Sequence, residues 1–187
     1  GFAPLNEATD WGRMTMDAAM GLRRELAASA DVIEQSSAAL DTPCRQLALA
    51  WRDLPQFEVL GSGPHAGTAA YGAAKLQEAV GCHAAGVDIE EWNHLNFFTA
   101  EPGQTGTILL ADPSFRSYSR AHEVALYLRT LGRPYAVVGG GVPDPAGAQD
   151  ELELRFSSSM REVLSPVVYC AILGLFAAWL NEITGAE

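Results

Sequence analysis

The spacing of hydrophobic and polar positions changes near residue 56. Before it, apolar residues such as Leu22 and Leu26 recur at three- and four-residue steps, which is typical of helices. Thr42 and Pro43 have the residue types of an N-cap and a first helical position, so they predict that a second helix begins there. Residues 1–55 are therefore expected to form a helical lead-in.

From residue 56 onward, short apolar runs alternate with helical stretches. The expected strands are FEVLG, CHAAGVDI, TGTILLADP, PYAVVGGG and, as a fifth strand at the sheet edge, LELRF. Alternation of this kind implies right-handed crossovers and a mostly parallel sheet with helices on both faces. Residues 56–187 are thus predicted to form a three-layer α/β domain with a five-stranded sheet. Ligands in such sheets bind at the carboxyl ends of the strands.

The most apolar run of the chain is Val167–Leu180, which follows a Ser165–Pro166 helix start. With fourteen residues it is too short to span a bilayer, so it is interpreted as a buried core helix. Because this helix is apolar nearly all round, we expect another domain to cover part of it. No signal peptide pattern is found, and a cytoplasmic protein is expected.

The formal net charge of -11 argues against binding to duplex nucleic acid or to anionic membranes. It is compatible with one small anion held by local backbone N–H groups. The three cysteines, Cys44, Cys82 and Cys170, are widely spaced and lack a CxxC pattern. Neither a disulfide framework nor a metal site is therefore expected, since the four histidines also lack ligand spacing.

A glycine cluster follows the first expected strand and opens a helix: Gly61, Ser62 and Gly63, then His65 in the first turn. It can serve a sugar phosphate, or a dinucleotide with Asp88 about twenty residues further on as the ribose-binding acid. It can equally be a tight turn that allows close packing. His65 is a candidate for contacting a ligand or for capping the helix.

Lys75 and Glu78 lie three residues apart on the next helix, with Tyr71 one turn earlier. Lys75 is the single lysine among twelve basic residues, which invites a chemical role beside the carboxylate. The alternative is a surface ion pair of little energetic consequence.

His94 follows the second expected strand, in a short helix or helical loop, and is either functional or a hydrogen-bonded structural residue. Serines 114, 117 and 119, together with Arg116, follow the third strand. They can bind phosphate at a helix N-terminus or simply cap that helix.

Taken together, the stretches VLGSGPHAGTAAYGAAKLQE, CHAAGVDIEEWNHLNFF and TGTILLADP resemble the second of two SIS (sugar isomerase) domains in the tandem sugar-isomerase family. This family includes the isomerase part of glucosamine-6-phosphate synthase, fructosamine-6-phosphate deglycases and amino-sugar-phosphate deaminases. Its pattern is Gly-x-Gly, a helix with Lys-Leu-x-Glu, and then Glu-x-x-His-Gly-Pro. Lys75 and Glu78 match the helix motif, and Glu91 and His94 match the last one at the family's spacing. The resemblance covers roughly residues 56–184 and implies a flavodoxin-like SIS fold.

The chain departs from this family pattern at three places. Leu95–Asn96 stands where the family has Gly-Pro, and Tyr71 stands where synthases often have glutamate. The family's phosphate loop, Ser-x-Ser-Gly-x-Thr, belongs to the first SIS half, and the matching loop here carries Phe115 in place of its glycine. The resemblance therefore implies that a partner SIS domain, in a homodimer or as an N-terminal half, binds the phosphate.

The activity implied by the resemblance is aldose–ketose chemistry at C1 and C2 of a phosphorylated sugar or amino sugar. Glu78 would move the proton between the two carbons, His94 would open the sugar ring, and Lys75 would polarise the open chain. In the family this histidine can come from the neighbouring subunit. The implied substrate-binding residues are Gly61, Ser62, Gly63, His65 and Tyr71.

Glu78 is expected to face the crevice at the strand ends, and no metal, nucleotide or other cofactor is required. Isomerase, deaminase and deglycase remain open. The alternative is a non-catalytic sugar-phosphate sensor or a pseudoenzyme, although residues 1–55 contain no basic candidate for a DNA-binding helix-turn-helix.

Overall fold

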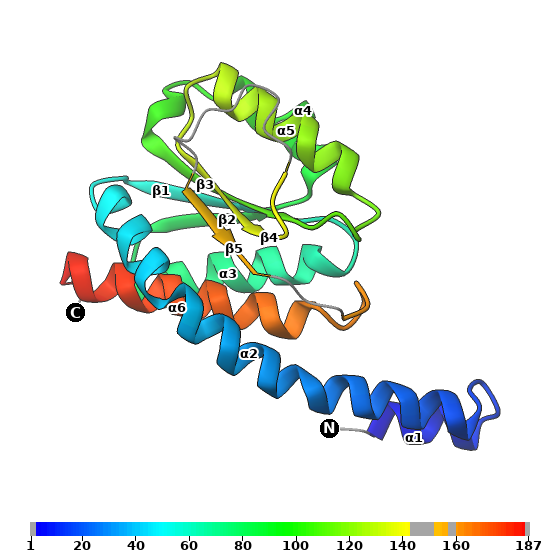
Figure 1. The fold of residues 1–187 in the computed structure, drawn as a ribbon. Coiled ribbons are helices and arrows are strands. Elements are labelled where there is room, and N and C mark those ends of the chain that lie inside the picture. Colours follow the sequence, from blue (N-terminus) through cyan, green and yellow to red (C-terminus); the bar gives the residue numbers. More distant parts are fainter. Residues whose placement is uncertain (1–2, 143–151, 157–159, 186–187) are drawn as a thin grey trace.

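The computed structural model describes residues 3–142, 152–156 and 160–185. In these ranges one sheet has five parallel strands in the order β2-β1-β3-β4-β5 (Figure 1). The strands are β1 (Gln56–Leu60), β2 (His83–Val87), β3 (Thr105–Ala111), β4 (Tyr135–Gly139) and β5 (Leu152–Arg155). In the register, Gln56 pairs with both His83 and Thr105. The predicted five-stranded α/β sheet is confirmed, with LELRF at an edge and the first strand in the interior.

Helices cover both faces of this sheet. One face carries α3 (Pro64–Val80), α6 (Pro166–Thr184) and the C-terminal part of α2 (Met16–Trp51), and the other carries α4 (Ile89–His94) and α5 (Tyr118–Thr130) (Figure 1). Two short 3₁₀ helices, η1 (Asn96–Phe98) and η2 (Pro102–Gln104), connect α4 to β3. The stretch EEWNHLNFF, residues 90–98, was expected to be a short helix or a helical loop, and it forms the end of α4 and then η1, with Leu95 between them.

Each face of the sheet has its own hydrophobic core. On the α2/α3/α6 side, Trp51 packs edge-on against Phe176, with ring centroids 5.9 Å apart, and also against Phe57. On the α4/α5 side, Trp92 and Leu109 belong to a second cluster. Because every residue of β3 is buried, this strand lies between the two cores.

The apolar helix α6 packs against α2 and α3. It has 19 residues, so the expectation that it is too short to span a bilayer is wrong. Core helices of soluble proteins can have the same length and composition. Its buried residues are Val168, Tyr169, Ile172, Leu173, Phe176, Ala177 and Leu180. The indole of Trp179 donates a hydrogen bond to Asp41 of α2 at 2.9 Å. This packing is that of the core helix predicted from the sequence.

The prediction that a second helix begins at Thr42–Pro43 is wrong. Helix α2 continues through Pro43 for 36 residues, and its N-cap is Thr15 instead. A proline inside a helix removes one backbone hydrogen bond. Burial of Leu40 and Cys44 on either side of Pro43 favours one continuous helix despite that loss.

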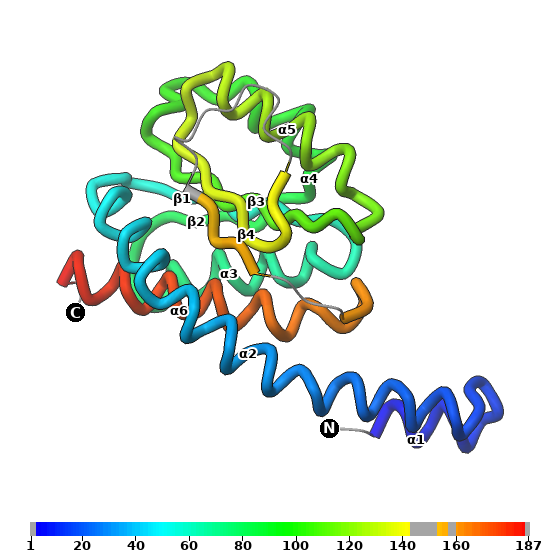
Figure 2. Tube along the Cα trace, viewed as in Figure 1, coloured from blue at the N-terminus to red at the C-terminus, as the bar shows by residue number. Residues whose placement is uncertain are grey.

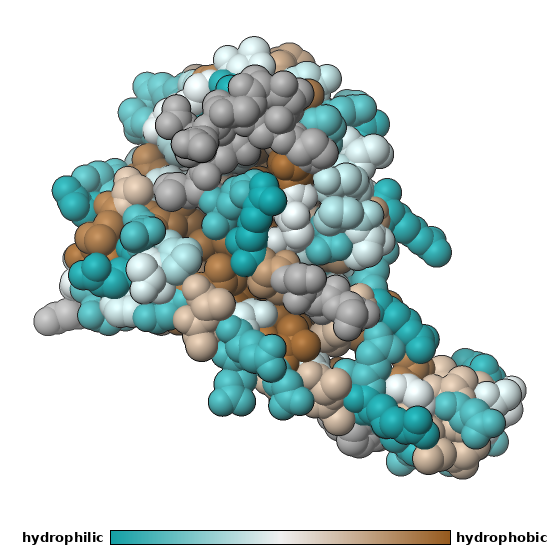
Figure 3. Space-filling view, in the orientation of Figure 1, coloured by the Kyte–Doolittle hydropathy of each residue, from teal (hydrophilic) through white to brown (hydrophobic). Residues whose placement is uncertain are grey.

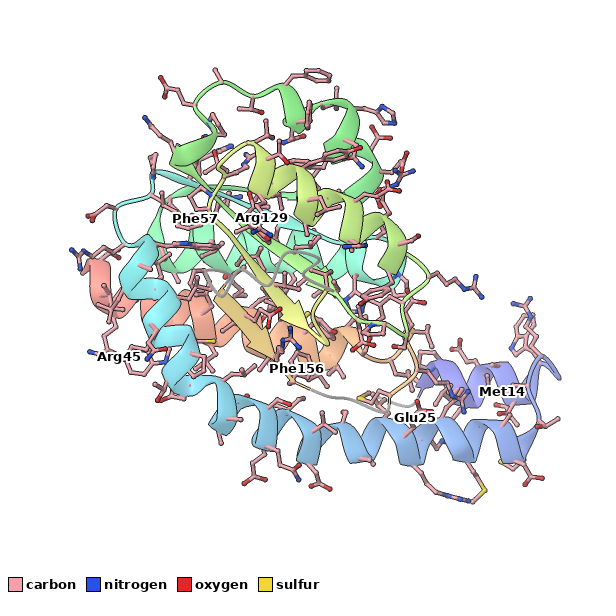
Figure 4. The ribbon with its side chains drawn as sticks, turned by 45° about the horizontal axis from the view of Figure 1, so that its top comes forward. Met14, Glu25, Arg45, Phe57, Arg129 and Phe156 are labelled. Atoms are coloured by element: carbon pink, nitrogen blue, oxygen red, sulfur yellow. The ribbon has the colours of Figure 1, made fainter. Side chains whose placement is uncertain are left out.

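The N-terminal half of α2 projects from the body as an arm, with α1 (Ala3–Asp10) beside its far end (Figure 2). The space-filling view shows this arm standing clear of the rest (Figure 3). Met14 lies at the outer end of the arm, whereas Glu25 lies nearer the body (Figure 4). There Glu25 pairs with Arg161 at 2.9 Å, which ties the arm to the turn before α6.

Candidate functional site

The glycine turn lies at the carboxyl end of β1, as predicted. A Cβ atom on Gly61 would come within 2.5 Å of the carbonyl oxygen of His65, and Gly63 has a φ of 58°. Both positions therefore require glycine, one for close approach and the other for its backbone conformation. Ser62 Oγ accepts a hydrogen bond from the Ile89 N–H at 3.3 Å, so the turn also contacts the start of α4.

His65 lies in the core beneath this turn. Its ring stacks on Phe115 at 4.3 Å between centroids and meets Tyr169 edge-on at 4.5 Å. Its Nε2 is 2.9 Å from Ser165 Oγ, whose own hydrogen is donated to the Glu162 carbonyl. Ser165 therefore accepts from a protonated Nε2, which leaves Nδ1 buried without a partner. Burial lowers the pKa of His65 to about 4, so the ring is neutral.

A cleft of about 570 Å³ lies beside the glycine turn, lined by Ser62, Gly63, Pro64, Arg116, Ser117, Arg161, Glu162 and Val163. Glu162 Oε2 accepts the Arg116 backbone N–H at 3.4 Å, so a carboxylate already lies at the loop that resembles the phosphate loop. Ser117 is the N-cap of α5 but makes no side-chain capping bond. Ser114 instead bonds to Asp112. This carboxylate opposes a bound phosphate, whereas the side chains of Arg116 and Arg161, which also line the cleft, attract one.

Tyr71, Lys75 and Glu78 form a strip on the outer side of α3. Lys75 Nζ donates to Glu78 Oε2 and lies 5.5 Å from the centre of the Tyr71 ring. The hydrogen bond to Glu78 raises the pKa of Lys75, so the lysine is cationic. The side chains of Lys75 and Glu78 are 36% and 63% exposed. The strip is therefore open to solvent in the isolated domain.

Glu78 does not face the crevice at the strand ends, so that expectation is wrong. Helix α3 begins at the carboxyl end of β1, and Glu78 lies about 21 Å along its axis from Pro64. The buried face of α3 is made by His65, Thr68, Ala69, Gly72, Ala73 and Leu76. A ligand at the strip would therefore need a second surface to enclose it.

His94 is the last residue of α4, on the other face of the sheet. Its side chain is 67% exposed, and Nε2 lies 3.5 Å from Glu90 Oε1. Glu90 also pairs with Arg120 at 2.7 Å. The fold thus brings Lys75 and Glu78 together but holds His94 apart from them, so one chain alone does not assemble all three.

A buried polar network is the feature that sequence reasoning missed. Glu58, in the middle of β1, pairs with Arg133 at 3.0 Å and accepts hydrogen bonds from Trp92 at 2.8 Å and Asn96 at 2.6 Å. A glutamate inside the apolar run FEVL was the available signal, because a buried carboxylate requires partners. Among the described residues, no group of three or more His, Cys, Asp or Glu side chains is arranged to hold a metal ion.

Comparison with known proteins identifies the fold. The C-terminal domain of glucosamine-fructose-6-phosphate aminotransferase from Francisella tularensis matches with a TM-score of 0.86 and 18% identity, over 98% of this chain and 50% of that one. Tagatose-6-phosphate ketose/aldose isomerase from Escherichia coli matches with a TM-score of 0.68 and 16% identity, over 87% and 44%. A protein from Escherichia coli CFT073, solved as a ligand complex, matches with a TM-score of 0.70 and 14% identity, over 93% and 95%.

The structural neighbours are SIS-domain proteins, which confirms the fold that the sequence resemblance implied. The chain spans about half the length of the first two of these proteins. No protein-family model matches the chain, and no curated protein matches its sequence.

Proposed function

We propose that this SIS domain acts on the C1–C2 unit of a 6-phosphosugar, with Glu78 as the base that transfers the proton between the two carbons. The observation that carries the proposal is the Lys75–Glu78 pair beside Tyr71 on helix α3 of an SIS fold. Proton transfer between adjacent carbons needs one carboxylate within reach of both, and it passes through an enediol or enolamine.

Lys75 has a defined part in this chemistry. Its ammonium group pairs with the Glu78 carboxylate and places a cation where negative charge develops on the sugar oxygen. The same cation would polarise the carbonyl of the open-chain sugar. Tyr71 would form one wall of the site, since its ring lies against the lysine.

The site would be completed by a second SIS domain packed against the outer face of α3. Three features support this assembly: the exposed strip, the carboxylate at the cleft loop, and the separation of His94 from Glu78. The partner domain would bind the phosphate. A second chain would supply His94 to open the sugar ring, so that each site combines residues of more than one domain.

The decisive experiment measures exchange of the substrate's C1 and C2 hydrogens with deuterium from solvent, in the complete protein. This exchange reports proton abstraction whether the net reaction is isomerisation, deamination or deglycation. We expect Glu78→Gln to lower the exchange rate by about 10²–10⁴-fold while 6-phosphosugar still binds. Fructose 6-phosphate and glucosamine 6-phosphate are suitable first substrates.

The chain offers a matched control for this substitution. Arg120 and Glu123 on α5 form an exposed ion pair with the same i,i+3 spacing as Lys75 and Glu78. Glu123→Gln should therefore leave both exchange and binding unchanged. Normal exchange in Glu78→Gln would remove Glu78 as the base.

A non-catalytic sugar-phosphate sensor is the second candidate. The separation of His94 from the Lys75–Glu78 pair favours it, because a domain that only binds a sugar phosphate does not need these side chains at one site. A sensor would bind 6-phosphosugars, and the unsubstituted protein would show no hydrogen exchange above the rate in buffer.

A further inference from the structure

Glu58 is a charged residue at a position where the sheet is otherwise apolar. It is 7% exposed, between Phe57 and Val59 on β1, and faces the α4/α5 layer through its contact with Trp92. Burial of an ionised carboxylate is unfavourable unless charge and hydrogen bonds compensate for the lost water. The residues that bond to Glu58 are therefore the ones whose positions depend on it.

Both carboxylate oxygens of Glu58 are used. Oε2 accepts from Trp92 Nε1 at 2.8 Å and lies 3.0 Å from a terminal nitrogen of Arg133, while Oε1 accepts from Asn96 Nδ2 at 2.6 Å. The other terminal nitrogen of Arg133 donates to the Asn96 carbonyl at 3.3 Å, and its guanidinium lies 5.5 Å from the centre of the Trp92 ring. Asn96 is thus held by its side chain and by its backbone.

Two of the residues that bond to Glu58 flank His94 in the sequence. Trp92 and Asn96 lie two residues before and two residues after it, and both bond to the one carboxylate of Glu58. Helix α4 ends at His94, since Leu95 has φ −121° and ψ −62°, outside the helical range. The His94 side chain itself points to solvent, at 67% exposure. Its side chain contacts Glu90 within α4, so the position of His94 depends on this contact and on the backbone that carries it.

We infer that the buried Glu58–Arg133 pair is the positioning device for His94, acting through Trp92 and Asn96. This inference rests on the ring-opening role proposed for His94. The inference also explains why this chain has Asn96 where the sugar-isomerase family that it resembles has proline. A proline would restrict the backbone there, whereas Asn96 fixes it through its amide hydrogen bond to Glu58.

The test replaces Asn96, because it is only partly buried and its loss spares the ion pair. Asn96→Ala removes the amide, and Asn96→Asp keeps the shape but places a second carboxylate against Glu58. Asn93→Ala is the matched control, since Asn93 lies in α4 next to His94 and its amide donates to the Ile89 carbonyl at 3.4 Å instead of to Glu58. Urea unfolding verifies that each variant is folded.

The first measurement is amide hydrogen exchange over residues 89–98, which requires no substrate. We expect both Asn96 variants to exchange faster there than the unsubstituted protein, with the Asp variant fastest, and Asn93→Ala to be unchanged. Equal protection of residues 89–98 in all four proteins would overturn the inference.

The second measurement compares fructose 6-phosphate with its 5-deoxy analogue, which has no hydroxyl at C5 to close a ring. Misplacement of His94 should lower kcat by up to about 10²-fold on the ring-forming sugar, with little change on the analogue. Equal losses on both sugars would mean that Asn96 is structural and would also overturn the inference. Normal turnover by His94→Ala on the ring-forming sugar would instead refute ring opening by His94, while hydrogen exchange would still decide whether Glu58 orders the segment.

Discussion

The buried His65 makes the stability of this domain sensitive to mild acid. In the folded chain, burial among Phe115 and Tyr169 opposes protonation and holds the pKa at about 4, against an ordinary value of 6.5. The nearby charge of Asp112 acts in the opposite direction but is the smaller effect. Unfolding exposes the imidazole to water and restores its ordinary affinity for protons.

The direction in which pH changes the stability follows from proton linkage. Between about pH 6.5 and pH 4 the unfolded chain binds a proton that the folded chain does not, so acid favours unfolding across this window. The difference between the two pKa values, at about 1.4 kcal/mol per pH unit, gives a loss of about 3 kcal/mol from His65 alone. The part of the unfolding free energy that depends on a neutral His65 is fully present above pH 6.5 and has been lost below pH 4.

The assay is urea unfolding across this pH range, followed by tryptophan fluorescence and circular dichroism. The comparison is between the unsubstituted protein and His65→Phe, which keeps an aromatic ring between Phe115 and Tyr169 but cannot titrate. Titration of carboxylates is common to both proteins, so the difference between their unfolding free energies isolates His65. His83→Gln serves as the control, because the His83 side chain is exposed.

We expect the difference between the two proteins to change by about 3 kcal/mol between pH 6.5 and pH 4, in favour of the variant at low pH. His83→Gln should follow the unsubstituted protein. If His65→Phe and the unsubstituted protein lose stability in parallel, His65 is not held neutral in the core and this reasoning is refuted.

Three other substitutions test the packing by urea unfolding. Gly86→Ala would place a methyl group 2.6 Å from the Ala70 nitrogen and should destabilise by about 1–3 kcal/mol; an unchanged midpoint would contradict this close contact between β2 and α3. Arg133→Met leaves Glu58 buried without its cation and should cost about 3–5 kcal/mol, whereas a loss below about 1 kcal/mol would mean that water reaches the carboxylate. Trp51→Ala should cost about 3–5 kcal/mol from the loss of its ring contacts, and a small effect would show that the α2/α6 side repacks.

The sequence predicted the elements of the sheet well, because buried strands and amphipathic helices leave distinct periodicities. The runs FEVL, TILLA and YAVV lie in interior strands, and LELR forms β5 at one edge of the sheet. Local turn chemistry was equally informative where it acts alone. The helix start expected at Ser165–Pro166 is the start of α6.

Local chemistry misled at Thr42–Pro43, where packing on both sides of the proline overrides its tendency to begin a helix. In the candidate site, too, neighbours in the sequence decide some features and tertiary packing decides others. Lys75 and Glu78 were expected to share a helix face, and they do, because that depends only on their spacing. Where this face points was not predictable, because it depends on the packing of α3 against the sheet and α6.

The sequence by itself therefore determined the fold class, the glycine turn and the pairing of Lys75 with Glu78, since each follows from periodicity or from neighbours in the chain. Tertiary structure alone decided that His65 is buried and neutral, that His94 and Glu78 lie on opposite faces of the sheet, and that Glu58 bonds to the residues around His94. The physical reason is that burial and charge compensation depend on residues far apart in the sequence. Glu58 and Asn96, for example, are 38 positions apart and become neighbours only when η1 packs against β1.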